Sequence, residues 1–238
     1  MGKRGNLVKP ARQEQTERPI RWRRYQQLFL IVCEDSVTEP AYFNLFAAQF
    51  PPDSMYVKPV GAGRDPEGVV QRAVREKALV TKESGKEVDF TWVVFDKDDA
   101  DLYAGRTAAW NRAHQEIATN KFRTAMSNEV FELWFLLHFE DVDPTVALPR
   151  QTVYQRLGAA IQGFPEYAAY IYDHYTDGGA VVPVIAAIGN QEEATRRAEL
   201  LLAYHGAKPP IQANPSTGVH LLVGELIDWI RYYNWQPE

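Results

Sequence analysis

The sequence has a single cysteine and no apolar run near the ~18–20 residues that a membrane-spanning helix needs. One cysteine excludes an internal disulfide framework and a cysteine-rich zinc module. The basic start of the chain lacks the apolar stretch of a signal peptide, so we expect a cytoplasmic protein without a membrane partner. Hydrophobic residues make up 45% and charged residues 24% of the 238 residues, which excludes collagen-like and wholly disordered chains.

Positive charge is scarce after the first 24 residues. Residues 1–24 hold eight basic and two acidic side chains, whereas the other 214 residues hold 18 basic and 29 acidic ones. This basic arm is either a flexible, solvated leader or a segment that contacts phosphate. Arg21, Arg23 and Arg24 surround Trp22, and guanidinium groups interleaved with an aromatic ring suit a nucleic acid.

Apolar runs alternate with helical stripes in the first 145 residues. The runs predict strands over residues 28–33, 55–60, 90–95 and 122–126, with helices after each one, the third over 100–118 and the fourth over 129–139. We expect Thr38 to cap the first helix. This order predicts an α/β fold, a Rossmann-like parallel sheet flanked by helices. Residues 25–145 would form this core, and residues 146–238 a mainly helical extension packed on it, with a last helix over 217–233.

Acidic side chains follow two of the predicted strands. Glu34 follows the first strand, and Asp96 and Asp98 follow the third. Ligands of open α/β sheets bind at the carboxyl ends of the strands, and a two-residue spacing points side chains the same way in an extended segment. Converging carboxylates repel one another unless a hard cation binds, which favours Mg²⁺ or Mn²⁺ over zinc. Alternatively, the aspartates are turn or cap residues and Glu34 is a solvated strand end.

Two further acids lie in predicted helices. Glu39 falls in a first helical turn, where the helix dipole favours an acid, so we expect a structural role. Glu132 lies in a helix that is apolar nearly all round, and a carboxylate there must be paired or bound to metal. We assign Glu132 to the site, with a structural pair to an arginine as the alternative. His138 lies well round this helix from Glu132, and we expect a satisfied histidine rather than a ligand.

Five segments in the same order resemble the RloB family, whose fold is similar to the Toprim domain of topoisomerases, primases and OLD-type nucleases. The segments cover about residues 28–226 and comprise 30–34 with 38–43, 61–66, 95–99, 127–138 and 214–223. Two positions depart from the family pattern. Asp35 stands where the family has glycine, and Glu129 with Val130 stands where it has Pro-Cys.

The resemblance implies a metal-dependent phosphoryl-transfer site in which Glu34, Asp96 and Asp98 hold Mg²⁺ or Mn²⁺. It also implies a component of a bacterial anti-phage system, often encoded near an ATPase. We therefore expect a nuclease that hydrolyses phosphodiester bonds, with RNA, including transfer RNA, favoured over DNA. Glu34 would be a ligand or general base, and Glu132 would bind a second metal or orient water. Arg64 would pair with a phosphate oxygen or brace its own loop.

Two other functions stay open. The first is a nonenzymatic regulatory subunit of an ATPase-containing defence complex. The second is a nucleotide-binding enzyme or small-molecule phosphotransferase, although residues 61–68 form no dinucleotide fingerprint and the sequence has no P-loop. An aromatic stretch over residues 167–175 could stack unpaired bases or pack within the helical extension.

Overall fold

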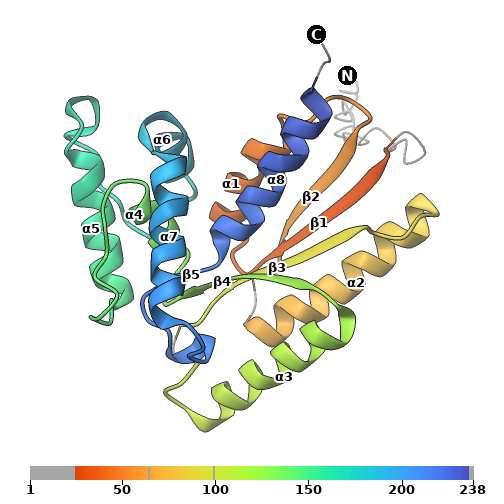
Figure 1. The fold of residues 1–238 in the computed structure, drawn as a ribbon, viewed down its shortest axis with the longest axis horizontal. Coiled ribbons are helices and arrows are strands. Elements are labelled where there is room, and N and C mark those ends of the chain that lie inside the picture. The colour runs from red at the N-terminus through yellow and green to blue at the C-terminus, as the bar shows by residue number, and fades with distance from the viewer. Residues whose placement is uncertain (1–24, 64, 99, 236–238) are drawn as a thin grey trace, which may run out of the picture.

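The computed structural model describes residues 25–63, 65–98 and 100–235, which Figure 1 shows around a five-stranded sheet. The strands lie in the order β2-β1-β3-β4-β5. The first four pair in parallel, whereas β5 pairs antiparallel with β4 at the edge. Their bounds are β1 (Gln27–Cys33), β2 (Met55–Gly61), β3 (Phe90–Asp96), β4 (Arg123–Asn128) and β5 (Ser216–Thr217).

Helices cover both faces of the sheet. They are α1 (Thr38–Ala47), α2 (Pro66–Ser84), α3 (Ala104–Asn120), α4 (Glu132–Leu137), α5 (Arg150–Gln162), α6 (Val181–Ile188), α7 (Gln191–His205) and α8 (Val219–Asn234), with short 3-10 turns η2 (Pro165–Tyr167) and η3 (Pro210–Gln212). α2 and α3 lie on one face, and α1 and α8 lie on the other (Figure 1). The predicted α/β fold with a mainly helical C-terminal portion is confirmed.

The position of β1 between two core layers explains why its sequence is an unbroken apolar run. Leu28, Leu30 and Val32 belong to the core layer under α2 and α3, whereas Phe29 and Ile31 belong to the layer under α1 and α8. Successive side chains of a strand point to opposite faces, so a strand buried on both faces needs apolar residues at every position. The same arrangement holds for β3, which lies beside β1 at the centre of the sheet.

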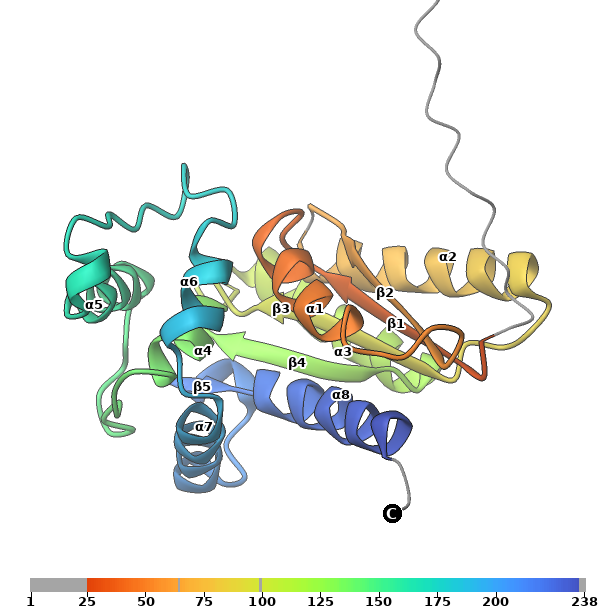
Figure 2. The same cartoon turned by 90° about the horizontal axis from the view of Figure 1, so that it is seen from above.

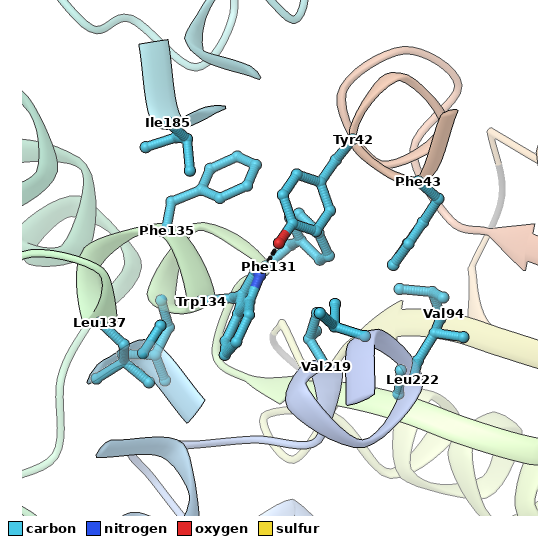
Figure 3. Packing of buried hydrophobic residues seen from close by; sticks show 14 of the residues in the cluster. Tyr42, Phe43, Val94, Phe131, Trp134, Phe135, Leu137, Ile185, Val219 and Leu222 are labelled. Atoms are coloured by element: carbon cyan, nitrogen blue, oxygen red, sulfur yellow. Dashed lines mark hydrogen bonds between the residues drawn. The ribbon is translucent and has the colours of Figure 1, made fainter. Parts of the chain in front are cut away.

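The helices α4 to α7 gather beyond the carboxyl ends of β3 and β4, as Figure 2 shows. A hydrogen-bond chain connects two of them, α4 and α7, to α1 on the sheet. Trp134 Nε1 of α4 donates to the Tyr42 hydroxyl of α1 over 2.8 Å, and this hydroxyl donates to Gln191 Oε1 of α7 over 3.1 Å. Figure 3 shows the Tyr42–Trp134 bond within the apolar cluster. The carboxyl ends of the strands therefore face a packed helical layer.

The sheet departs from the predicted all-parallel arrangement at β5. Ser216 and Thr217 pair with Asn128 and Ser127, and the Ser127 and Thr217 hydroxyl oxygens lie 3.0 Å apart. The 214–217 segment thus supplies an edge strand, after which Thr217 Oγ1 accepts from Val219 N at the start of α8. β5 and α8 therefore place part of the C-terminal portion directly on the sheet.

Several predicted boundaries were wrong. The helix predicted over 129–139 is only the short α4, and the one predicted over 100–118 begins at residue 104. Thr38 does not cap α1 through its side chain. Instead, the carboxylate of Asp35 accepts from the backbone N–H groups of Thr38 and Ser36. In the described part of the chain, no helix is both long enough and apolar enough to span a membrane.

Candidate functional site

Glu34 follows β1 and connects it to the end of β3. Its backbone N–H donates to the Val94 carbonyl over 2.9 Å, and its Oε2 accepts from the Asp96 backbone N–H over 2.8 Å. The pKa of Glu34 is raised to about 8, mainly by burial and also by the negative charges of neighbouring aspartates, while the hydrogen bond from Asp96 acts in the opposite direction. Glu34 is therefore not the solvated strand end of the alternative prediction.

Asp96 is the last residue of β3 and lies beside Glu34. The pKa of Asp96 is raised well above its usual range. Desolvation is the largest cause, and the negative charges of Glu39, Glu34 and Glu132 add to it. Its Oδ1 is buried and has no hydrogen-bond partner among the described residues. A buried carboxylate oxygen without a partner is costly unless something positively charged or hydrogen-bonding reaches it.

Glu39 is a functional candidate that the sequence reasoning assigned only a structural role. It lies in the first turn of α1 as predicted, yet it is 2% exposed, and its Oε2 accepts from the Asp35 backbone N–H over 3.2 Å. Burial and the charges of Glu34 and Asp35 raise its pKa well above the usual range. The sequence did contain a signal. Glu39 precedes Tyr42 and Phe43 by three and four positions and so shares their buried helix face.

Asp98 lies at the site, but its backbone conformation differs from the predicted one. The chain is not extended there, because Asp98 has a φ of 47° and the strand ends at Asp96. Lys97 is buried between the two aspartates, with its Nζ 2.7 Å from Asp101 and 3.8 Å from Glu129. The prediction that the side chains of Asp96 and Asp98 point the same way from an extended segment was therefore wrong. Both residues nevertheless line the same cavity.

This cavity has a volume of about 320 Å³ and opens beside the carboxylates. Glu34, Asp96 and Asp98 line one side, while the starts of α2 and α3 contribute the other side with Asp65, Pro66, Arg106, Ala109 and Trp110. On the far side of Asp98, Arg150 Nη1 lies 3.1 Å from the Asp98 carboxylate. Two arginines thus flank the acidic site, which is the side-chain type that pairs best with phosphate oxygens.

Glu132 is buried at 4% exposure in α4 and its charge acts on Asp96 and Glu39. Its Oε1 accepts from the Tyr172 hydroxyl over 2.6 Å and lies 2.8 Å from His174 Nδ1. The predicted alternative of a pair with an arginine was therefore wrong, because Glu132 contacts a tyrosine and a histidine instead. The hydrogen bond to Glu132 raises the pKa of His174.

His138 differs from the satisfied histidine that we expected. Both ring nitrogens are buried without a hydrogen-bond partner in the described part of the chain. Burial and the charge of Arg197 lower its pKa to about 4, so the ring is neutral at physiological pH. Its ring packs edge-on against Trp134 at 5.2 Å between centroids.

The two departures from the resembled family leave the core of the site in place. Asp35 does not have a positive φ, and its carboxylate caps the start of α1. Glu129 lies beside the positive groups of the site, with its Oε2 accepting from the Arg150 backbone N–H over 3.1 Å and its Oε1 3.8 Å from Lys97 Nζ. The residues predicted to contact phosphate lie outside the described residues; these are Arg21, Arg23, Arg24 and Arg64.

The donor set suits a hard divalent cation, although the side chains are not gathered into a finished ligand set. Across residues 25–63, 65–98 and 100–235, no group of three or more histidine, cysteine, aspartate or glutamate side chains is arranged to hold a metal ion. Even so, the charges of Glu34 and Glu39 raise the pKa of Asp96, and Asp96 Oδ1 is buried without a described partner. A cation would offset both costs, and carboxylate oxygens are the ligands that Mg²⁺ prefers.

Fold and site together define an α/β protein with a buried cluster of acids at the carboxyl ends of its central strands. The chain belongs to the RloB-like protein family, whose model matches residues 29–226. No curated protein and no solved structure matches the chain. The family match runs from the third residue of β1 to the middle of α8.

Proposed function

We propose that this RloB-like chain is a Mg²⁺-dependent nuclease that hydrolyses phosphodiester bonds. The observation that carries the proposal is the convergence of Glu34, Glu39 and Asp96 at the carboxyl ends of β1 and β3, beside a cavity of about 320 Å³. Mutually repelling, partly buried carboxylates lower the stability of a fold, and functional sites are where such groups concentrate. The preference for RNA over DNA and the role as an anti-phage effector follow from the motifs shared with the family.

Glu34 and Asp96 would hold the cation, with Asp98 at the rim of the same cavity and Mn²⁺ as a substitute for Mg²⁺. When bound, the cation would supply Lewis-acid stabilisation of the charge that develops on a phosphate. Glu34 can hold a proton near neutral pH because its pKa is raised to about 8. Its Oε2 is occupied by the Asp96 N–H, so Oε1 is the oxygen available to exchange that proton. Loading the site must therefore release protons.

The positive groups at the cavity would orient the substrate. Arg106 lines the cavity from the first turn of α3, and Arg150 lies against Asp98 at the start of α5. Buried Lys97 bridges Asp101 and Glu129 and partly offsets the negative charge next to Asp96. A phosphate held by these arginines would lie beside the carboxylates that line the cavity.

The test is cleavage of labelled transfer RNA, single-stranded RNA and duplex DNA in Mg²⁺, Mn²⁺ or EDTA. Asp96→Asn keeps the shape of the side chain but removes its charge, so we expect it to abolish cleavage without unfolding the protein. Asp228→Asn is the matched control, because Asp228 is 78% exposed on α8 and pairs only weakly with Arg231 at 3.7 Å. A folded, active Asp96→Asn variant, or cleavage that survives EDTA, would overturn the proposal.

One observation favours a second function, that of a nonenzymatic subunit of an ATPase-containing defence complex. The acids of the described chain are not arranged to hold a metal ion, which is also expected of a vestigial site. Such a subunit would bind its partner equally well with and without Asp96 and Mg²⁺. Co-purification of the wild-type and Asp96→Asn chains with the neighbouring ATPase distinguishes the two functions, provided that cleavage is measured on the same samples.

A further inference from the structure

The loop between η2 and α6 carries an aromatic cluster to the edge of the acidic site. Tyr172 and His174 of this loop both contact Glu132, although they follow it by 40 and 42 positions in the chain. Glu132 is 4% exposed and its charge acts on Asp96. The contacts to Glu132 therefore fix the loop, which has no regular secondary structure, next to the carboxylates.

Within this cluster, Tyr154, His174 and Tyr175 form an aromatic platform. The rings of Tyr154 and His174 are stacked, with centroids 4.8 Å apart and planes only 8° from parallel. Tyr175 meets His174 edge-on, with centroids 5.2 Å apart and planes at 78°. Tyr154 covers one face of the imidazole and Glu132 binds its Nδ1 edge, yet 41% of the His174 side chain is exposed. The exposed part of His174 therefore lies beside a tyrosine that is 82% exposed.

The platform lies within reach of a phosphate at the acids. Arg150 and Tyr154 are four positions apart on α5, so they share one face of that helix about 5–6 Å apart at Cβ. Arg150 contacts Asp98, while Tyr154 stacks on His174. His174 also contacts Glu132 over 2.8 Å, so the platform lies next to the acidic site. A nucleotide bridges such a distance with its phosphate at one end and its base at the other.

We propose that an unpaired nucleobase stacks on the exposed rings of His174 and Tyr175, next to the Tyr154–His174 stack. The inference rests on the proposed nuclease function and names its substrate class, single-stranded nucleic acid. A base inside a duplex has both faces covered by its neighbours, whereas an unpaired base can give one face to an aromatic ring. Stacking of this kind tolerates any base, because every base has a π-face.

The test is binding of a fluorescently labelled single-stranded RNA, the same strand as DNA, and the matching duplex, measured by anisotropy in EDTA and again in Mg²⁺. His174→Ala should weaken binding of the single strand roughly 5- to 150-fold, which is the loss expected from one stacked base, and should leave duplex binding unchanged. His174→Phe keeps a flat ring without the bond to Glu132, so it should retain most of the affinity. Tyr175→Ala should cause a smaller loss.

Two controls separate stacking from damage to the fold. Tyr232→Ala removes a tyrosine that is 66% exposed on α8, and it should bind like the wild type. If His174 only anchored the loop through Glu132, then His174→Phe would lose as much affinity as His174→Ala. That result would overturn the inference, and so would unchanged binding by His174→Ala, equal wild-type affinity for strand and duplex, or failure of the wild type to bind the single strand.

The outcomes for the two proposals are distinct. Binding in EDTA needs no cleavage, so a loss of affinity in His174→Ala together with no cleavage of any substrate would uphold the platform and reject the nuclease. Cleavage that depends on Asp96 but proceeds equally in His174→Ala, with unchanged single-strand binding, would uphold the nuclease and reject the platform.

Discussion

Replacing Glu34 by glutamine should stabilise the metal-free protein at alkaline pH. Glu34 has its pKa raised from 4.5 to about 8 by burial and neighbouring charge, so the folded state binds a proton that the unfolded state has lost in this pH range. A raised pKa contributes stability that is fully present below about pH 4.5 and is lost as the pH rises towards 8. Glutamine does not titrate, and its carbonyl oxygen can still accept from the Asp96 N–H.

The expected size follows from proton linkage. One proton changes the free energy of unfolding by about 1.4 kcal/mol per pH unit, and the change levels off near the folded pKa. Between pH 6 and 8, the wild type should therefore lose about 2 kcal/mol that Glu34→Gln does not lose. For a protein of this size, the difference corresponds to about 4–8 °C in Tm. Titrating groups that the charge of Glu34 does not affect, such as His174, contribute equally in both proteins and cancel in the comparison.

The assay is thermal unfolding of the wild type, Glu34→Gln and Glu166→Gln across pH 6 to 8 in EDTA. Glu166 is exposed and far from the acidic cluster in sequence, so its variant should follow the wild-type curve. Mg²⁺ should raise the wild-type Tm more at pH 8 than at pH 6, because the acids must lose their protons to bind it. Parallel curves for the wild type and Glu34→Gln in EDTA would refute the reasoning about this site.

Three further predictions concern the support of the site and its basic arm. Tyr42→Phe removes the acceptor of buried Trp134 Nε1 and should cost about 1–3 kcal/mol in urea unfolding, so an unchanged midpoint would contradict the hydrogen-bond chain. Gly61→Ala would place a Cβ 2.4 Å from Ser36 Cα and should weaken Mn²⁺ binding, whereas Gly105→Ala, with nothing within 4 Å, should not. Deleting residues 1–24 should weaken RNA binding and reduce its salt dependence. Unchanged binding would show that the basic arm does not contact the RNA.

The order of strands and helices up to β4 could be predicted because its signals are local. β1 and β3 are buried on both faces, and each therefore appears in the sequence as an unbroken apolar run. β5 could not be predicted in this way. It is two polar residues long, and its pairing with Ser127 joins positions 90 residues apart. Only the packing of α7 and α8 brings that segment to the sheet edge.

The acids at strand ends could be predicted for the same reason, whereas their surroundings could not. Glu34 and Asp96 follow from the rule that parallel strands present their carboxyl ends at one edge. The position of Asp98 depends on a left-handed φ, which no sequence pattern indicates. The contacts of Glu132 with Tyr172 and His174 depend on how an irregular loop folds back over α4. Local periodicity contains no information on such a contact.

The central claim is that the carboxylates at the ends of β1 and β3 hold a divalent cation, and calorimetric titration with Mn²⁺ at pH 7.5 tests it most directly. The account predicts saturable binding by the wild type with release of protons, loss of this binding in Asp96→Asn, and its retention in Asp228→Asn. Absence of binding by the folded wild type, or equal binding by Asp96→Asn, would contradict it.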